Sequence, residues 1–408
     1  MKRTVFLLGA GAAIDWNGPS TQKITDSLIS QGPKNQNDEY ILKYIKDYFN
    51  DNRKSDDLNF EGIIDIIEQC AQFWISLDSN HIINAKLIPQ NHIFWQNTIN
   101  FDYINNLRSY NNNLNKQANF FCYLLMNCYE TIIWYIRQYS QFWQNKNNIF
   151  SEENTEVNEL ATTYLKEKSK SNYLRIYSLN YDRVIQAMFN EISIPIFQGF
   201  DSKNIVPSLE EWHQCVDTKR ILTSYNEHCI YHLHGNFCWS VNNTNANGLD
   251  GYQIGNGYYH YPLENNGFQQ VFSEMGKPLF LTPIITGYSK VQRTNLTPFK
   301  QMASAFDIDC HMADELIIIG YSFGDLHIND TIRQAKKCNP NLNITIVTAP
   351  ERKEEFKLKI ANNLFMHWEK INDFIFTNNC DEAFSMQYKT RIIFKYFKDY
   401  LKNSQTNL

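Results

Sequence analysis

The stretch Thr4–Leu8 (TVFLL), which runs directly into Gly9–Ala13 (GAGAA), decides the fold class. A short apolar run that ends in a glycine turn is typical of a buried parallel strand at the start of an α/β unit. A signal peptide begins in a similar way, with Lys2 and Arg3 ahead of an apolar run and small residues. We prefer the strand because the run is very short and an α/β pattern follows it.

Strand and helix patterns alternate through the rest of the chain. Four further segments have strand character: Tyr173–Ser178, Cys229–His234, Glu315–Ile319 and Asn343–Val347. Helix-compatible segments follow three of them: Arg183–Glu191, Asp325–Cys338 and Glu351–Leu364. This alternation predicts an α/β fold, a Rossmann-like parallel sheet with helices on both faces.

The remaining segments predict the domain organisation. Ile63, Ile66 and Ile67 repeat at helical spacing, and Phe120–Tyr139 is apolar enough for a buried helix. We therefore expect a mainly helical insertion at about 35–170 within a catalytic domain spanning 1–350. Residues 240–270 suit a loop or small hairpins. We expect 351–408 to form a C-terminal helical segment packed on the same domain, with a terminal helix over 381–403.

Composition limits the classes of function. Of the 408 residues 43% are hydrophobic, which allows a large core, and a net charge of −5 disfavours a basic nucleic-acid coat. We predict no direct nucleic-acid binding. No apolar run approaches the roughly 18 residues of a membrane span. None of the nine cysteines forms Cys-x-x-Cys, so we expect a cytoplasmic protein with no zinc or other metal site.

The glycine turn is the first candidate site. Gly9 and Gly11, with Ala10, Ala12 and Ala13 around them, would let the backbone approach a phosphate at a helix N-terminus. Pro19 lies in a rigid loop that we expect over the same strand end. A tight structural turn is the alternative.

Asn180 follows the strand predicted at Tyr173–Ser178, where open α/β sheets place their ligand-binding groups. Its carboxamide can hold a sugar hydroxyl or a water through one donor and one acceptor. Asp182 could brace the loop or accept a hydrogen bond from a neighbouring hydroxyl. A plain turn or helix cap would explain the same residues.

Two histidines end the strand predicted at Cys229–His234. Alternation places His232 and His234 on one face, and His234 comes just before Gly235, free to point into a cleft. Imidazole accepts a proton near neutrality, so His234 is a candidate general base. We interpret His232 as a core residue. A metal site of both histidines with His228 is disfavoured, because no carboxylate or cysteine is suitably spaced.

The last candidate site follows the buried strand at Glu315–Ile319. Gly320 and Ser322 lie in the small-residue turn before the next helix and could receive a ribose or an adenine. A plain strand–turn–helix connection is again the alternative.

In this order the segments resemble the sirtuin superfamily, and more closely the bacterial sirtuin-like NAD hydrolases of antiphage defence. The resemblance covers Gly9–Ser20, Tyr177–Asp182, Leu233–Gly235, Pro278–Lys290 and Ala313–Asp330. The chain lacks the four-cysteine zinc module of sirtuin deacetylases, which argues against deacylation. It also has Ala13 where sirtuins often have serine.

The resemblance implies cleavage of NAD to nicotinamide and ADP-ribose, linear or cyclic. NAD would be the substrate, with no other cofactor. It would contact Gly9, Ala10, Gly11, Ala12, Ala13, Pro19, Asn180, Gly320 and Ser322. The pyrophosphate would lie on the amides of Gly9 and Gly11, and Asn180 would hold the nicotinamide ribose and a water. Asn180, Asp182 and His234 would be the catalytic residues.

The resemblance also implies latency, meaning that the enzyme is inactive until it is triggered, since an unregulated NAD hydrolase would kill its own cell. We expect a homo-oligomer, with a ring-forming DNA-translocating ATPase of HerA type as a possible partner. The alternatives are an NAD-dependent ADP-ribosyltransferase or deacylase, and a nucleotide-sensing subunit without turnover. The presence of both Asn180 and His234 argues against a mere binder.

Overall fold

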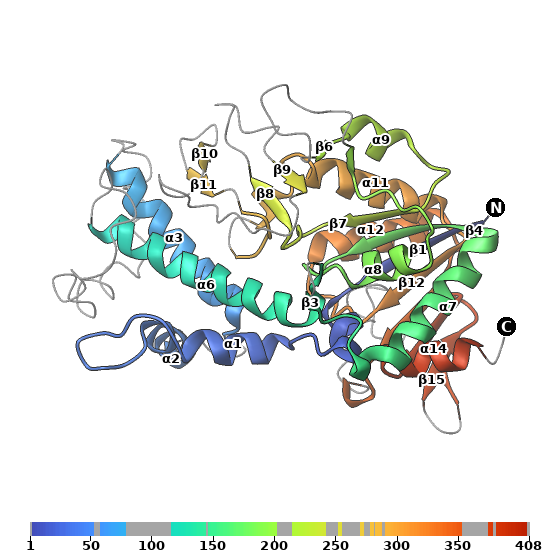
Figure 1. Cartoon of the computed structure of the whole chain (residues 1–408), viewed down its shortest axis with the longest axis horizontal. Helices are drawn as coiled ribbons and strands as arrows, with labels where there is room; N and C mark the ends of the chain where they lie inside the picture. Colours follow the sequence, from blue (N-terminus) through green and yellow to red (C-terminus); the bar gives the residue numbers. More distant parts are fainter. Residues whose placement is uncertain are drawn as a thin grey trace.

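The centre of the fold is an eight-stranded sheet in the order β14-β15-β16-β13-β12-β1-β4-β7 (Figure 1). The computed structural model describes residues 2–52, 58–78, 116–143, 146–201, 214–241, 252–254, 270–272, 278–280, 282–287, 290–352, 374–377 and 381–405. The strands are β1 (Lys2–Leu8), β4 (Asn172–Ser178), β7 (Cys229–His232), β12 (Glu315–Ile319), β13 (Asn343–Thr348), β14 (Ile375–Phe376), β15 (Glu382–Ser385) and β16 (Thr390–Phe394).

Six neighbouring strands of this sheet are parallel, from β16 to β7. Numbered along the chain, they lie in the order 6-5-4-1-2-3, which is the doubly wound arrangement of dinucleotide-binding folds. The order reverses between β1 and β12, so the switch point lies where these two strands end. The predicted Rossmann-like sheet is confirmed.

Side chains of β1 point alternately to the two faces of the sheet and pack into two separate hydrophobic cores. Phe6 and Leu8 pack on one face of the sheet, and Val5 and Leu7 pack on the other. The first face is covered by α7 (Thr155–Ser171), α8 (Val184–Glu191) and α14 (Phe397–Gln405). The second is covered by α9 (Thr218–Thr223), α11 (Phe299–Met312) and α12 (Leu326–Cys338). Helices therefore lie on both faces, as predicted.

The C-terminal part of the sheet differs from our expectation. A terminal helix over 381–403 is wrong, because β15 and β16 lie in that range and α14 begins only at Phe397. The two strands pair in antiparallel fashion around a turn in which Lys389 has a φ of 46°. β16 then extends the sheet beside β13, and its Ile392–Phe394 run is buried. Residues 353–364 of the helix predicted at 351–364 lie outside the described residues.

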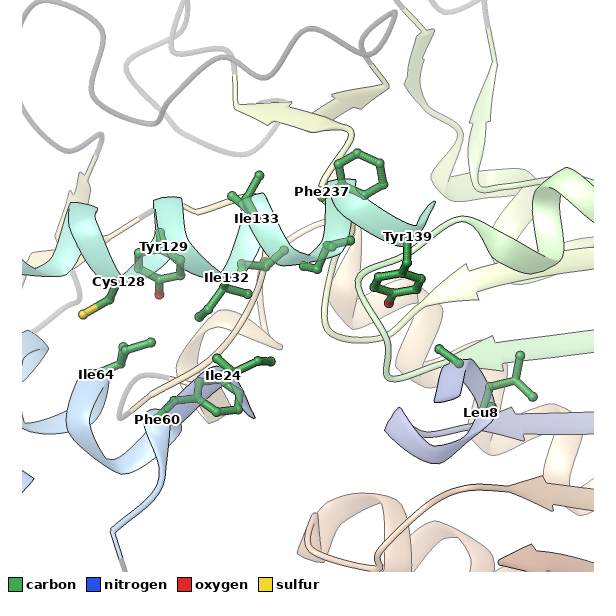
Figure 2. Close-up of a cluster of buried hydrophobic side chains, with 14 of the residues drawn as sticks. Leu8, Ile24, Phe60, Ile64, Cys128, Tyr129, Ile132, Ile133, Tyr139 and Phe237 are labelled. Atoms are coloured by element: carbon green, nitrogen blue, oxygen red, sulfur yellow. The ribbon is translucent and has the colours of Figure 1, made fainter. Parts of the chain in front are cut away.

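The helical insertion extends to one side of the sheet (Figure 1). Within the predicted range lie α2 (Ile41–Asn52), α3 (Phe60–Asp78) and α6 (Lys116–Ser140), and α1 (Thr21–Ile29), which precedes that range, packs with them. By contrast, α7 packs on the sheet itself. Figure 2 shows Ile24, Ile64 and Ile132 meeting between these helices, in the same hydrophobic cluster as Leu8 of β1. None of the helices within the described ranges combines the length and apolarity that a bilayer crossing requires.

Several short elements lie outside the main sheet. They are η1 (Ala10–Trp16), β2 (Phe142–Trp143), β3 (Lys146–Asn147), η2 (Glu152–Asn154), β5 (Phe200–Asp201), β6 (Gln214–Val216), β8 (Trp239–Val241), β9 (Tyr252–Ile254), β10 (Gln270–Phe272), β11 (Pro278–Phe280), α10 (Lys290–Arg293) and η4 (Pro350–Arg352). β8 and β9 pair in antiparallel fashion, which agrees with small hairpins in the described part of 240–270.

Two glycine turns meet at the switch point. The Gly9 amide donates to the Ile319 carbonyl, and the Gly11 amide donates to the Gly320 carbonyl, both at 2.9 Å. A Cβ on Gly11 would lie 2.7 Å from the Gly320 Cα, and one on Gly320 would lie 2.3 Å from the Ala12 nitrogen. Gly320 also has a φ of +62°, which disfavours any side chain. The backbones approach this closely only because both positions are glycine.

We predict that Gly320→Ala lowers the free energy of unfolding by about 3 kcal/mol or more, because left-handed strain adds to a clash with backbone. Gly324→Ala is the matched control, since its Cβ would meet only the Ser322 Oγ at 3.7 Å. Urea unfolding followed by circular dichroism measures both. Equal stabilities of the two variants would contradict the assignment.

Candidate functional site

In the glycine turn after β1, the amides of Gly9, Gly11 and Ala12 already donate hydrogen bonds within the protein. Gly9 and Gly11 donate to carbonyls of the neighbouring turn, and the Ala12 amide donates to the Gly9 carbonyl at 2.9 Å. Ala10 is exposed at the tip of the turn, whereas Ala12 and Ala13 are buried. A phosphate on the Gly9 and Gly11 amides would require these hydrogen bonds to break. The geometry thus favours the structural-turn alternative for the two glycines.

The remaining predicted nucleotide contacts line the same edge of the sheet. Pro19 is half-buried just ahead of α1. Gly320 directly follows β12, and its amide donates to the Val347 carbonyl at 2.9 Å. Ser322 is exposed in the turn between β12 and α12. These positions lie beside the switch point, where dinucleotides bind to folds of this topology.

Asn180 lines a small closed cavity at the end of β4. The cavity measures about 10 Å³ and is also lined by Ala12, Ala13, Asp182 and His232. This is room for about one water molecule. The Asn180 backbone is fixed on both sides, because its amide donates to the Ser178 Oγ at 3.1 Å and its carbonyl lies 3.0 Å from the His232 Nδ1.

Asp182 braces the site. Its Oδ2 accepts a hydrogen bond from the Tyr139 hydroxyl at 3.0 Å, and its Oδ1 accepts from the Val184 amide at 3.0 Å, at the start of α8. Burial raises the pKa of Asp182, and these hydrogen bonds oppose the rise. Figure 2 shows Tyr139 at the end of α6 that lies nearest the sheet. Both carboxylate oxygens have structural partners, so the geometry fits the bracing role better than a catalytic one.

His232 is a core histidine, as predicted. Its Nε2 lies 2.5 Å from the amide nitrogen of Gln186, and its Nδ1 lies 3.0 Å from the Asn180 carbonyl oxygen. The amide must donate to Nε2, so Nδ1 carries the proton and donates to the carbonyl. Burial lowers the pKa of His232 to about 4. This histidine is neutral and fixes the turn that carries Asn180.

His234 lies beyond the end of β7, in the turn that follows it. Its side chain is 4% exposed, and its ring is hydrogen-bonded to the backbone of Leu179. Its Nε2 has no hydrogen-bond partner among the described residues and lies 4.0 Å from the Asp325 Oδ1. Burial and then the Lys290 ammonium lower its pKa to about 3. The ring is therefore neutral, with Nε2 available as an acceptor.

Asn180 and His234 therefore flank the same backbone segment without sharing the small cavity. The His234 ring is bonded to Leu179, which directly precedes Asn180. The histidine in the cavity beside Asn180 is His232. The carboxamide and the candidate base therefore lie near the same strand end but do not line one common cavity.

Sequence analysis missed the charged groups around His234. Lys290 Nζ lies 2.5 Å from the Asp325 Oδ1, and the ring of His327 lies 6.3 Å from that of His234. Burial opposes ionisation of Asp325, but the charge and hydrogen bond of Lys290 help to lower its pKa overall. Asp325 and His327 come just after the turn at Gly320–Gly324, so their position at a strand end was the available signal.

A larger depression opens on the insertion side of the site. It measures about 640 Å³ and lies between η1 and the end of α6, where Trp16, Asn17, Trp134, Tyr135 and Tyr139 line it. Small-molecule sites have volumes of this order. Tyr139 links this depression to Asp182 through its hydroxyl.

Comparison with protein families gives one match. Residues 174–368 match the family model described as a SIR2-like domain. The matched range contains Asn180, His234 and Asp325. A search of curated proteins finds no match to the chain. The match shows that this part of the chain, somewhat less than half of it, is similar to a SIR2-like domain. Among the residues that the structure describes, no three histidines, cysteines or carboxylates are grouped to hold a metal ion.

We predict that Tyr139→Phe lowers the free energy of unfolding by about 1–3 kcal/mol, because it leaves a buried carboxylate oxygen of Asp182 without its donor. Tyr225→Phe removes an exposed hydrogen bond to the Leu222 carbonyl and should cost less than about 0.5 kcal/mol. Chemical denaturation at neutral pH compares the two variants. Similar losses would show that Asp182 does not depend on Tyr139.

A second prediction concerns acid. The folded-state pKa of His234 is about 3 and its ordinary value is 6.5, so stability is lost as the pH falls below 6.5. Between pH 7 and pH 5 this one residue should remove about 2 kcal/mol. His234→Gln should lose about that much less over the same range, whereas His311→Gln, at a part-exposed histidine, should behave like the wild type. Identical pH profiles for all three proteins would refute the buried neutral state.

Proposed function

We propose that this protein is an NAD glycohydrolase, which cleaves the bond between nicotinamide and ribose to give nicotinamide and ADP-ribose. One observation carries the proposal. A carboxamide, Asn180, and an imidazole with an unpartnered nitrogen, His234, flank one strand end beside the switch point of a doubly wound sheet. The SIR2-like match over this region supports the use of NAD.

Cleavage of NAD requires few catalytic groups from the protein. Nicotinamide leaves a cationic pyridinium as a neutral base, so its departure needs no general acid. What remains is to stabilise an oxocarbenium-like ribose and to position a nucleophile. The Asn180 carboxamide offers one donor and one acceptor, which suit a ribose hydroxyl and a water.

His234 would accept the proton from that water or from a ribose hydroxyl. The bond to the Leu179 backbone holds the ring, and Nε2 retains its lone pair because the imidazole is neutral. A base with a pKa of about 3 is weak, and catalysis is best served by a pKa near the working pH. Activity would thus require a bound state in which the pKa of His234 is higher.

The closed geometry supports latency. The cavity beside Asn180 holds about 10 Å³, and His234 is almost fully buried, so NAD could enter only after the turns at this edge rearrange. We propose that assembly into a homo-oligomer, or a partner such as a HerA-type DNA-translocating ATPase, triggers that opening in the cytoplasm. Depletion of NAD would then make the protein an effector of abortive infection against phage.

We predict that His234→Ala reduces NAD hydrolysis by about 100- to 10,000-fold, the usual effect of losing a general base. His311→Gln, at the part-exposed histidine of α11, should leave the rate unchanged. Chromatography of NAD incubated with purified protein, with and without the product of its neighbouring gene, measures nicotinamide and ADP-ribose.

Three outcomes would contradict the proposal. Wild-type rates in His234→Ala would remove the histidine from the mechanism. ADP-ribose attached to protein would indicate a transferase. Binding of NAD without turnover in every preparation would indicate a sensing subunit.

A further inference from the structure

We propose that Lys290 is the binding site for the diphosphate of the dinucleotide. This inference rests on the NAD-binding part of the function proposed above and adds a residue that sequence analysis assigned to no role. It is based on the position of the Lys290 ammonium group near His234. At this edge of the sheet, the glycine amides that were expected to bind phosphate already donate to protein carbonyls.

A diphosphate needs positive charge or free amides, and the amides of the three glycines at this edge are not free. The amides of Gly9, Gly11 and Gly320 all donate to protein carbonyls at 2.9 Å. The first two hydrogen bonds hold the turn after β1 against β12, and the third joins the end of β12 to β13, so breaking them would cost stability at the centre of the fold. A cationic side chain is the alternative source of strong contacts with phosphate.

Lys290 has the right location. Its Nζ lies 2.5 Å from the Asp325 Oδ1 and 4.0 Å from the Glu61 Oε1, and its side chain is 17% exposed. The same Asp325 oxygen lies 4.0 Å from the His234 Nε2. The Lys290 ammonium is therefore connected to His234 through the Asp325 carboxylate, at the edge of the sheet where β7 and β12 end.

The helix that carries Lys290 is firmly anchored. Arg293, on the same short helix, is fully buried, pairs with Glu68 of α3 and donates to the carbonyls of Phe280 and Thr286 at 2.8 Å. α3 also supplies Glu61. A lysine on a firmly anchored helix keeps its position, as a ligand-binding group must.

The present partners of Lys290 can be exchanged for phosphate. The contact with Glu61 is long, at 4.0 Å, and Glu61 is exposed, so this ion pair is weak. Asp325 is the stronger partner, and a diphosphate can replace it because it offers more charge than a carboxylate. The groups facing His234 are Lys290, Asp325 and His327. Once phosphate neutralises Lys290, the Asp325 carboxylate is the dominant charge and raises the proton affinity of His234. Binding of the substrate would in this way strengthen the base.

The test is calorimetric titration of the full chain with ADP-ribose, which measures binding without turnover. Lys290→Met should weaken binding about ten- to a hundredfold, the range of a lost charge-assisted hydrogen bond, and should reduce the salt dependence of the affinity. Lys290→Arg should restore most of both. Lys300→Met, at an exposed lysine of α11, is the control and should match the wild type. Thermal melting confirms that each variant is folded.

Each outcome separates this proposal from the proposed function. Equal ADP-ribose affinity and salt dependence in Lys290→Met and the wild type overturn the lysine site and leave NAD hydrolysis untouched. Lys290-dependent binding by a protein that never cleaves NAD supports the lysine site and removes the hydrolase. A wild-type chain that binds no ADP-ribose, either alone or with the product of its neighbouring gene, overturns both.

Discussion

The backbone contact between Gly11 and Gly320 holds the centre of the fold together. It joins the turn after β1 to the turn after β12, and these strands stand at the switch point of the sheet. A Cβ at either position would fall within 3 Å of backbone atoms, so the two turns could not meet if either carried a side chain. The Gly11 amide donates to the Gly320 carbonyl in this contact, and the Gly9 and Gly320 amides donate to Ile319 and Val347, so none of the three glycine amides is free.

Local pattern was enough to predict most of the parallel sheet, because each of its strands is a short apolar run next to a turn. β12 and β13 were found within one residue of their ends, and β4 and β7 within two. The strand β16 was missed because Ile392, Ile393 and Phe394 are all buried and show no alternation that would exclude a helix. Only pairing with β13, far away in the sequence, decides its conformation.

The residues of the candidate site were likewise only partly predictable from the sequence. Asn180 and His234 were predictable because both follow a strand, and strand ends of a parallel sheet meet at one edge. The partners that decide their roles come from elsewhere in the chain. Tyr139 binds Asp182 from the insertion, and Lys290 binds Asp325 from a short helix. No spacing rule brings such pairs together, so sequence analysis assigned Asp182 a catalytic role and gave Lys290 none.

The insertion is part of the site as well as of the core. α6 reaches Asp182 through Tyr139, and α3 reaches the short helix of Lys290 through Glu61 and Glu68. Its helices also share one hydrophobic cluster with Leu8 of β1. A displacement of α3 and α6 relative to the sheet would thus act on the support of Asn180 and on the charge beside His234 together. A signal received by the insertion has a direct physical route to both halves of the site.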